Sequence, residues 1–173
     1  RRCAALMVFI FAAPLFADGC EARAWNGTGT DWTWQAEAIE TPFALNLASF
    51  PSSVGTPQQV RAAFASSRLA WNGAGADMSV LDGGETTATS WEMDETNVMQ
   101  FDPGSFGGGT LAVAQYWSSG GKTYDCDIRF YAQNDWGAID WSVDPTGAGA
   151  NEFDLQYVAE HEIGHCLGLS HSD

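Results

Sequence analysis

The sequence contains few basic residues and few histidines. Its 173 residues include 7 lysines and arginines against 22 aspartates and glutamates, so the formal net charge at pH 7 is −15. A surface of this sign repels polyanions, which argues against nucleic acid or an anionic membrane as the partner. The excess of acid is typical of a soluble, self-repelling surface.

Three other features are missing. Residues 104–109 are rich in glycine, but no Lys-Ser or Lys-Thr pair accompanies them, so a nucleotide-binding phosphate loop is not indicated. The acidic residues do not follow the spacing of an EF-hand. The apolar run over residues 4–16 is shorter than the roughly 20 residues that a membrane helix needs. We therefore predict no membrane span.

The N-terminus has the features of an export signal. Arg1 and Arg2 precede the apolar run, and small residues at Ala22-x-Ala24 follow it, which predicts a cleaved signal peptide over residues 1–24. Residues 25–173 then form one secreted domain. Because the sequence starts without methionine and stops two residues after its last histidine, we expect it to be incomplete at both ends.

All three histidines lie in one stretch, His161-Glu162-Ile163-Gly164-His165-Cys166-Leu167-Gly168-Leu169-Ser170-His171. On a helix, residues four apart share one face with Cβ atoms about 5–6 Å apart. His161 and His165 can therefore bind one zinc ion through Zn–N bonds of about 2.0–2.1 Å. If the helix continued, His171 would lie ~15 Å farther along its axis. We therefore expect a sharp turn before His171, for which Gly168 can adopt a positive φ.

Glu162 directly follows the first histidine, so it flanks the metal without having to bind it. This position suits a general base that takes a proton from water. The short pattern H-E-x-x-H also occurs by chance on helices, but the added glycine and third histidine make such a match rare. We predict that His161, His165 and His171 bind one catalytic zinc ion.

Two of the four cysteines belong to the mature domain. Cys3 and Cys20 fall within or next to the predicted signal peptide. In an oxidising compartment the remaining pair, Cys126 and Cys166, is more often bridged than free. The alternative is that Cys166 binds the metal, but three histidines already serve that purpose. We predict a disulfide that ties the metal helix to an upstream strand.

The hydrophobic pattern predicts two helices and several strands, an α+β fold. Thr56, Pro57 and Gln59 form a capping box that starts the first helix, and Asn72-Gly73 ends it. Asp154 suits the start of the second helix, which carries the histidines. Strands are expected over residues 43–47, 78–81, 97–101, 111–117 and 126–131, with an irregular segment over 133–151.

The histidine motif is the metzincin signature, and residues 158–172 resemble the matrixin branch of these zinc metallopeptidases, including Ser172 after the third histidine. The resemblance extends more loosely over residues 40–172. It implies a metzincin, matrixin-like zincin fold, in which a twisted mixed β-sheet carries two main helices and the second helix holds zinc. It also implies a methionine turn and a specificity-pocket wall, both of which would follow the end of this sequence.

The same resemblance suggests further sites. Residues 111–114 are similar to the edge strand that holds an extended peptide, so the backbone of Leu111 and Ala112 is predicted to contact substrate by strand addition. An ordinary sheet strand is the alternative. Calcium is a further cofactor candidate, with oxygen ligands among the loop acids; the alternative, that most of these acids are simply solvated, is favoured. The candidates are Asp125, Asp127, Asp135, Asp140, Asp144 and Glu152.

These observations predict a secreted zinc-dependent endopeptidase that acts as a monomer on protein or peptide substrates. Zinc would activate a water molecule and Glu162 would act as the general base. The alternative is a secreted, zinc-containing binding module without catalytic activity. The eight tryptophans could give such a module a glycan-binding surface.

Overall fold

The computed structural model describes residues 33–34, 39–74, 78–89, 91–119, 122–144, 146–169 and 171. The predicted signal peptide, with Cys3 and Cys20, lies outside these residues, as does Ser172. Among the residues described, no helix is long and apolar enough to cross a membrane.

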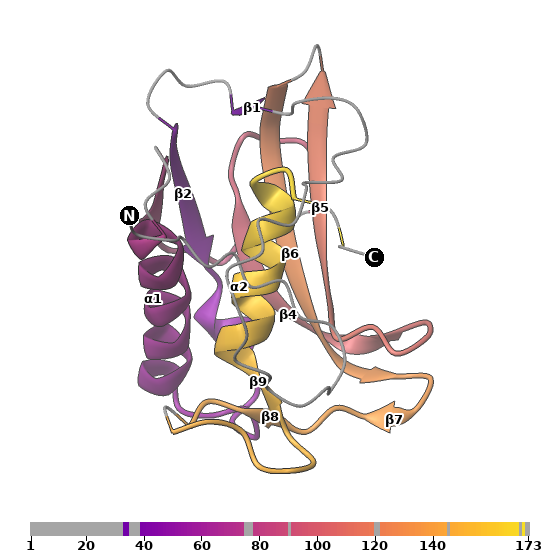
Figure 1. The fold of residues 1–173 in the computed structure, drawn as a ribbon. Coiled ribbons are helices and arrows are strands. Elements are labelled where there is room, and N and C mark those ends of the chain that lie inside the picture. The colour runs from indigo at the N-terminus through magenta and orange to yellow at the C-terminus, as the bar shows by residue number, and fades with distance from the viewer. Residues whose placement is uncertain are drawn as a thin grey trace.

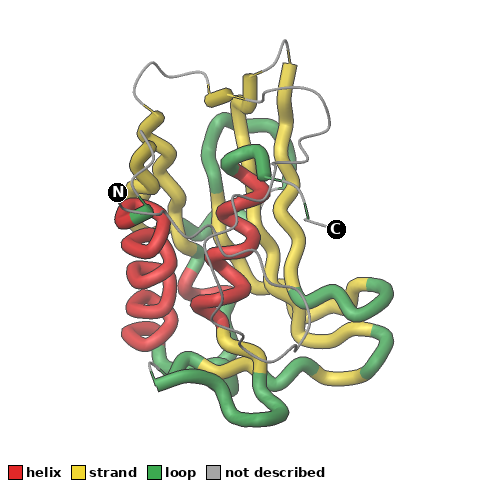
Figure 2. Tube along the Cα trace, in the orientation of Figure 1, coloured by secondary structure: helices red, strands yellow, loops and turns green. Residues whose placement is uncertain are grey.

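The fold is α+β, as predicted, with two α-helices against a mixed sheet (Figures 1 and 2). The helices are α1 (Pro57–Gly73) and α2 (Leu155–Cys166), with a short 3-10 helix η1 (Leu47–Ser49). The strands are β1 (Thr33–Trp34), β2 (Ile39–Leu45), β3 (Met78–Glu85), β4 (Val98–Phe106), β5 (Ala112–Ser119), β6 (Lys122–Asn134), β7 (Gly137–Ala138), β8 (Trp141–Ser142) and β9 (Phe153–Asp154).

In the described part of the chain, seven strands form one sheet. Its order is β1-β6-β4-β2-β3, and β5 and β7 also pair with β6. The pairs β2/β3, β2/β4, β4/β6 and β1/β6 are parallel, whereas β5 and β7 run antiparallel to β6. The long strand β6 therefore lies between β4 and β5, and it also pairs with β1 and β7. Strands β8 and β9 form a separate two-stranded sheet.

Both helices begin where their capping residues predict. The Thr56 hydroxyl accepts the N–H of Gln59, whose side chain accepts the N–H of Thr56 in return, and Pro57 occupies the first turn. At α2, the Asp154 carboxylate accepts the N–H groups of Gln156 and Tyr157. Local sequence thus sets where each helix begins, and the two predicted starts are confirmed.

Several strands extend farther than the sequence pattern predicts. β3 continues through Gly83 to Glu85. A Cβ atom at position 83 would lie 2.6 Å from the backbone carbon of Phe43 on β2, so a larger residue would collide with that strand. Glycine therefore permits close strand pairing here. β4 continues past Pro103 to Phe106, with a register shift between Asp102 and Ser105 that accommodates the proline. The predicted ends at residues 81 and 101 were wrong.

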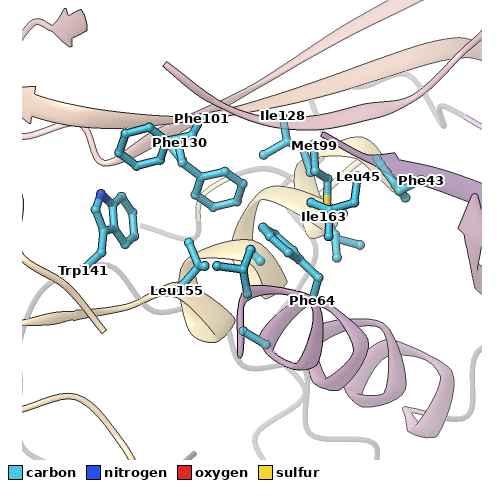
Figure 3. Packing of buried hydrophobic residues seen from close by; sticks show 14 of the residues in the cluster. Phe43, Leu45, Phe64, Met99, Phe101, Ile128, Phe130, Trp141, Leu155 and Ile163 are labelled. Atoms are coloured by element: carbon cyan, nitrogen blue, oxygen red, sulfur yellow. The ribbon is translucent and has the colours of Figure 1, made fainter. Parts of the chain in front are cut away.

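The core lies between the sheet and the two helices (Figure 3). Phe64 from α1 and Ile163 from α2 are fully buried, and both point towards the strands. The rings of Phe64 and Phe130 meet edge to face with centroids 5.4 Å apart. This packing fixes α2, the helix with the histidine motif, against the sheet.

The two faces of β6 differ in chemistry. Cys126, Ile128 and Phe130 are buried in the core on the helix side. Asp125 and Asp127, on either side of Cys126, therefore point to the opposite face, since side chains alternate along a strand. The segment over residues 94–98 lies there: the N–H groups of Asp94 and Glu95 are donated to the carboxylate of Asp125, and that of Val98 to the carboxylate of Asp127. Each side of β6 is thus covered by a different part of the chain.

Candidate metal centre

Helix α2 carries His161, Glu162 and His165 and packs beside β5 (Figure 1). The two histidines are four residues apart, so they lie on one face of the helix. Both are partly buried, whereas Glu162 is 5% exposed. The helix is held on its other side by core residues, among them Leu155, Ala159 and Ile163. The histidine side chains therefore project from a rigid element.

The chain turns sharply after α2, at Gly168. The N–H of Leu169 is donated to the carbonyl of Gly164, and the N–H of Gly168 to the carbonyl of His165, which is the hydrogen-bond pattern of a Schellman motif. Gly168 has φ of +95°, a conformation that side-chain-bearing residues rarely adopt. This turn reverses the chain and brings His171 back to the helix.

The three imidazoles converge through their Nε2 atoms. The Nε2 of His165 lies 2.9 Å from that of His161 and 2.9 Å from that of His171, and the third distance is 3.2 Å. A tetrahedral ion with Zn–N bonds of about 2.0–2.1 Å holds its nitrogens about 3.3 Å apart. One proton could bridge a single pair of these nitrogens, whereas a metal ion would bind all three lone pairs. The triangle therefore fits a zinc ion.

The Nδ1 contact of His165, and the burial of His161 and His165, support a metal site at the Nε2 atoms. The Nδ1 of His165 lies 2.8 Å from the carbonyl oxygen of Leu169, so Nδ1 carries the proton and Nε2 the lone pair in the neutral ring. Nδ1 of His161 is buried and has no hydrogen-bond partner in the described part of the chain. Burial, and then the charges of His165 and His171, lower the pKa of His161 to about 4. Burial also lowers the pKa of His165. Both rings are thus neutral at pH 7, the state that binds metal.

Glu162, which directly follows His161 on α2, is a buried carboxyl group. Burial raises its pKa to about 7, and a hydrogen bond from the backbone N–H of Ala114 acts in the opposite direction. A carboxyl group with a pKa near 7 can both accept and release a proton at neutral pH. The arrangement therefore combines three converging imidazole nitrogens with a proton acceptor.

β5 is an edge strand in the described part of the sheet, and its register shows which backbone groups face outward. The N–H of Tyr131 on β6 is donated to the carbonyl of Leu111, so this pair is hydrogen-bonded. Such pairs alternate with non-bonded pairs along an antiparallel ladder. Ala112, opposite Phe130, and Ala114, opposite Ile128, belong to the non-bonded pairs. Their N–H and C=O groups therefore point away from β6.

The predicted substrate contacts thus differ in orientation. The carbonyl of Leu111 is directed into the sheet, whereas the backbone of Ala112 is directed to the edge. The contact between Ala114 and Glu162 was not predicted. Sequence alone could not identify it, because strand register depends on pairing with β6, which is distant in the chain.

The structure joins Cys126 and Cys166 in a disulfide, with Cα atoms 5.6 Å apart. Both residues are buried in the core. The bond links the last residue of α2 to the middle of β6. The sulfur of Cys166 is therefore engaged in this bond and faces the sheet.

The six acids considered for calcium do not share one location. Asp125 and Asp127 are buried on β6, while Asp135, Asp140, Asp144 and Glu152 are exposed. Among the residues described, the three histidines are the group of His, Cys, Asp or Glu side chains that lie close enough to share an ion. Calcium binding by the acids stays a prediction.

Comparison with known proteins agrees with this geometry. The profile of the family described as Matrixin matches residues 82–173, just over half of the chain. Over 46 residues, the chain is 52% identical to Matrix metalloproteinase-B of Caenorhabditis elegans. That stretch is 27% of this chain and 8% of the relative, so the chain spans only a small part of the relative's length.

Proposed function

Because the chain belongs to the matrixin family of metallopeptidases, we propose that it is a secreted zinc-dependent endopeptidase. The observation that carries this proposal is the convergence of three Nε2 atoms beside a buried carboxyl group. Zinc is assigned to His161, His165 and His171, which supply the three protein ligands typical of a catalytic site. When bound, zinc supplies a Lewis acid that polarises a peptide carbonyl and lowers the pKa of water towards about 7.

Glu162 moves the proton. Its carboxylate accepts a proton from the attacking water and then donates it to the leaving amine. In the metal-free protein, burial raises the pKa of Glu162 to about 7, so this carboxyl group takes up a proton more readily than a solvated glutamate does. Burial keeps the carboxyl group away from bulk solvent.

The peptide substrate lies along β5 as an added strand. The outward N–H and C=O groups of Ala112 bind its backbone, as is typical of recognition by β-strand addition. The carbonyl of Leu111 is already bonded to Tyr131, so Leu111 contributes through its backbone N–H. Main-chain recognition of this kind accepts many sequences, so side-chain preference depends on other parts of the cleft.

We also propose that residues 25–173 form one domain, exported by the signal over residues 1–24 and acting as a monomer. The core supports a single unit, since it extends from Phe43 to Cys166. N-terminal sequencing of the exported protein and light scattering test these points. Retention in the cell, or a stable dimer at micromolar concentration, would contradict them.

The decisive test is digestion of casein or gelatin by the full secreted protein. We expect digestion that 1,10-phenanthroline abolishes and added zinc restores. Glu162→Gln should keep one zinc per chain by elemental analysis but lose activity by about 100- to 10,000-fold. A wild-type protein that binds zinc but leaves both substrates intact would favour the binding-module alternative. An active Glu162→Gln variant would refute the role of this residue.

A further inference from the structure

Side chains of α1 hold the backbone of α2 at two successive turns. The hydroxyl of Ser67 is donated to the carbonyl of Gln156 at 2.9 Å. The indole N–H of Trp71 is donated to the carbonyl of Glu160, also at 2.9 Å. The donors are one helical turn apart and so are the acceptors, so the two helices run in the same direction where they touch (Figure 1). These bonds therefore set how far α2 lies along α1 and how it is rotated about its own axis.

Trp71 makes a second contact with α2, at Gly164. A Cβ atom at position 164 would lie 3.0 Å from the Cζ2 atom and 3.4 Å from the Cη2 atom of the indole ring. A side chain there would have to displace the ring, so glycine permits this close approach. In an α-helix the carbonyl of Glu160 also accepts the N–H of Gly164, and a carbonyl oxygen has two lone pairs for two donors. Trp71 thus binds one turn of α2 through both its ring and its N–H.

This turn of α2 carries the two helix ligands of the candidate metal centre. Glu160 directly precedes His161, and Gly164 directly precedes His165. Trp71 therefore contacts the residue before each of these histidines. It holds the stretch of backbone from which both imidazoles project.

Gly164 also connects Trp71 to the turn that returns His171. The carbonyl of Gly164 accepts the N–H of Leu169 at 2.9 Å. The side chain of Leu169 packs near the indole, because its Cδ1 atom would lie 3.6 Å from the same Cβ position. The carbonyl oxygen of Leu169 in turn lies 2.8 Å from Nδ1 of His165. The contacts of Trp71 thus reach backbone next to the two helix ligands and the turn before the third.

We propose that Trp71 is a positioning residue for the zinc site, which holds His161 and His165 in place and supports the turn towards His171 before the ion binds. The inference rests on the proposed function, since it takes zinc as the ion that the three histidines bind. Ligands that are already in place lose little further freedom when the ion arrives, so this positioning raises zinc affinity.

The zinc affinity of the full secreted protein tests this role without an activity assay. Replacing Trp71 by 3-benzothienylalanine puts sulfur in place of the N–H and keeps the shape of the ring, and Trp71→Phe removes the N–H genetically. In both variants we expect zinc affinity to fall by about five- to tenfold, the effect of one lost hydrogen bond, as measured by competition with a chromogenic chelator. The visible absorption bands of the Co²⁺-loaded protein should also change, because these bands depend on ligand geometry.

Ser67→Ala is the matched control. It too removes a hydrogen bond between α1 and α2, but the hydroxyl of Ser67 bonds to Ala63 and Gln156, neither of which adjoins a histidine. Ser67→Ala and Trp71→Phe should both lower the urea midpoint of the metal-free protein. Only the Trp71 variants should lose zinc affinity, whereas Ser67→Ala should stay within about twofold of the wild type with unchanged Co²⁺ bands. A merely structural contact would alter stability alone.

The outcomes separate the two proposals. A wild-type protein that binds no zinc would overturn both. If the wild type binds zinc but hydrolyses no peptide, the proposed function fails, while the comparison of zinc affinities still decides the role of Trp71. A benzothienylalanine variant with the zinc affinity and Co²⁺ bands of the wild type would overturn the positioning role. An equal loss of affinity in Ser67→Ala would also overturn it, since the effect would then reflect general loosening of α2.

Discussion

Cys166, which directly follows His165 on α2, is covalently joined to Cys126 on the central strand β6. Strands β4 and β5 pair with the two sides of β6. The disulfide therefore anchors the C-terminal end of the metal helix, next to a candidate ligand, to the most extensively paired strand of the described sheet.

We expect Cys126→Ala/Cys166→Ala to lower the free energy of unfolding by about 3–4 kcal/mol, the chain-entropy contribution of a cross-link that closes a loop of this size. The two cysteines are 40 residues apart in the sequence. Urea unfolding at a fixed free zinc concentration measures the change. A loss below about 0.5 kcal/mol would show that α2 is held by packing alone.

The turn at Gly168 gives a second prediction. Alanine is strained at φ of +95°, so Gly168→Ala should displace the segment that returns His171 to the helix. We expect zinc affinity to fall by roughly tenfold, equivalent to about 1.4 kcal/mol, as measured by competition with a chromogenic chelator. Gly147→Ala is the matched control, since Gly147 has φ of +107° and open space around it, far from the motif in sequence. Equal affinity of the two variants would contradict the prediction.

Zinc should stabilise the folded protein. With free zinc at 100 times the dissociation constant, the unfolding free energy should rise by about 2.7 kcal/mol. His171→Ala should remove most of this gain while leaving the stability of the metal-free protein nearly unchanged, because His171 is exposed and lies after the helix. Thermal unfolding with and without chelator provides the comparison. An undiminished zinc effect in His171→Ala would exclude this residue as a ligand.

The elements that sequence predicted well depend on local signals. The capping residues of both helices act within three positions, so they can be recognised in any sequence. The approach of His171 to the other histidines also follows from a local requirement, the turn at Gly168. Helix starts and the convergence of the motif could thus be anticipated.

The features that sequence missed depend on distant pairing. Gly83 and Pro103 usually interrupt strands, yet both lie within strands whose neighbours hold them. Likewise, nothing near Ala114 indicates that its N–H faces outward, because a shift of one residue against β6 would reverse it. The full length of the sheet and the contact with Glu162 therefore required the three-dimensional structure.

The buried acids of β6 were also hard to interpret from sequence, because they look like loop acids when their burial is unknown. Asp127 is 1% exposed, and one of its carboxylate oxygens has no hydrogen-bond partner in the described part of the structure. Burial, followed by the negative charges of Asp125 and Asp94, raises the pKa of Asp127 to about 7. The N–H of Val98 and the charge of Arg129 oppose this shift without cancelling it.

This shift predicts how stability depends on pH. The unfolded chain releases the Asp127 proton near pH 3.9, whereas the folded protein retains it until about pH 7. Between these values the folded state binds more protons, so the contribution of Asp127 to stability falls as pH rises and is constant above pH 7. Asparagine does not titrate. The unfolding free energy of Asp127→Asn minus that of the wild type should therefore rise from pH 5 to pH 7.

Urea unfolding of the two proteins at pH 5, 6, 7 and 8 measures this difference, in which the contributions of groups common to both proteins cancel. Asp144→Asn is the control, because hydrogen bonds from Thr146 lower the pKa of Asp144. The stability from that group is lost only at more acidic pH, so its difference from the wild type should be constant over the same range. A constant difference for Asp127→Asn as well would mean that Asp127 is ionised in the folded protein, with its charge compensated inside the sheet.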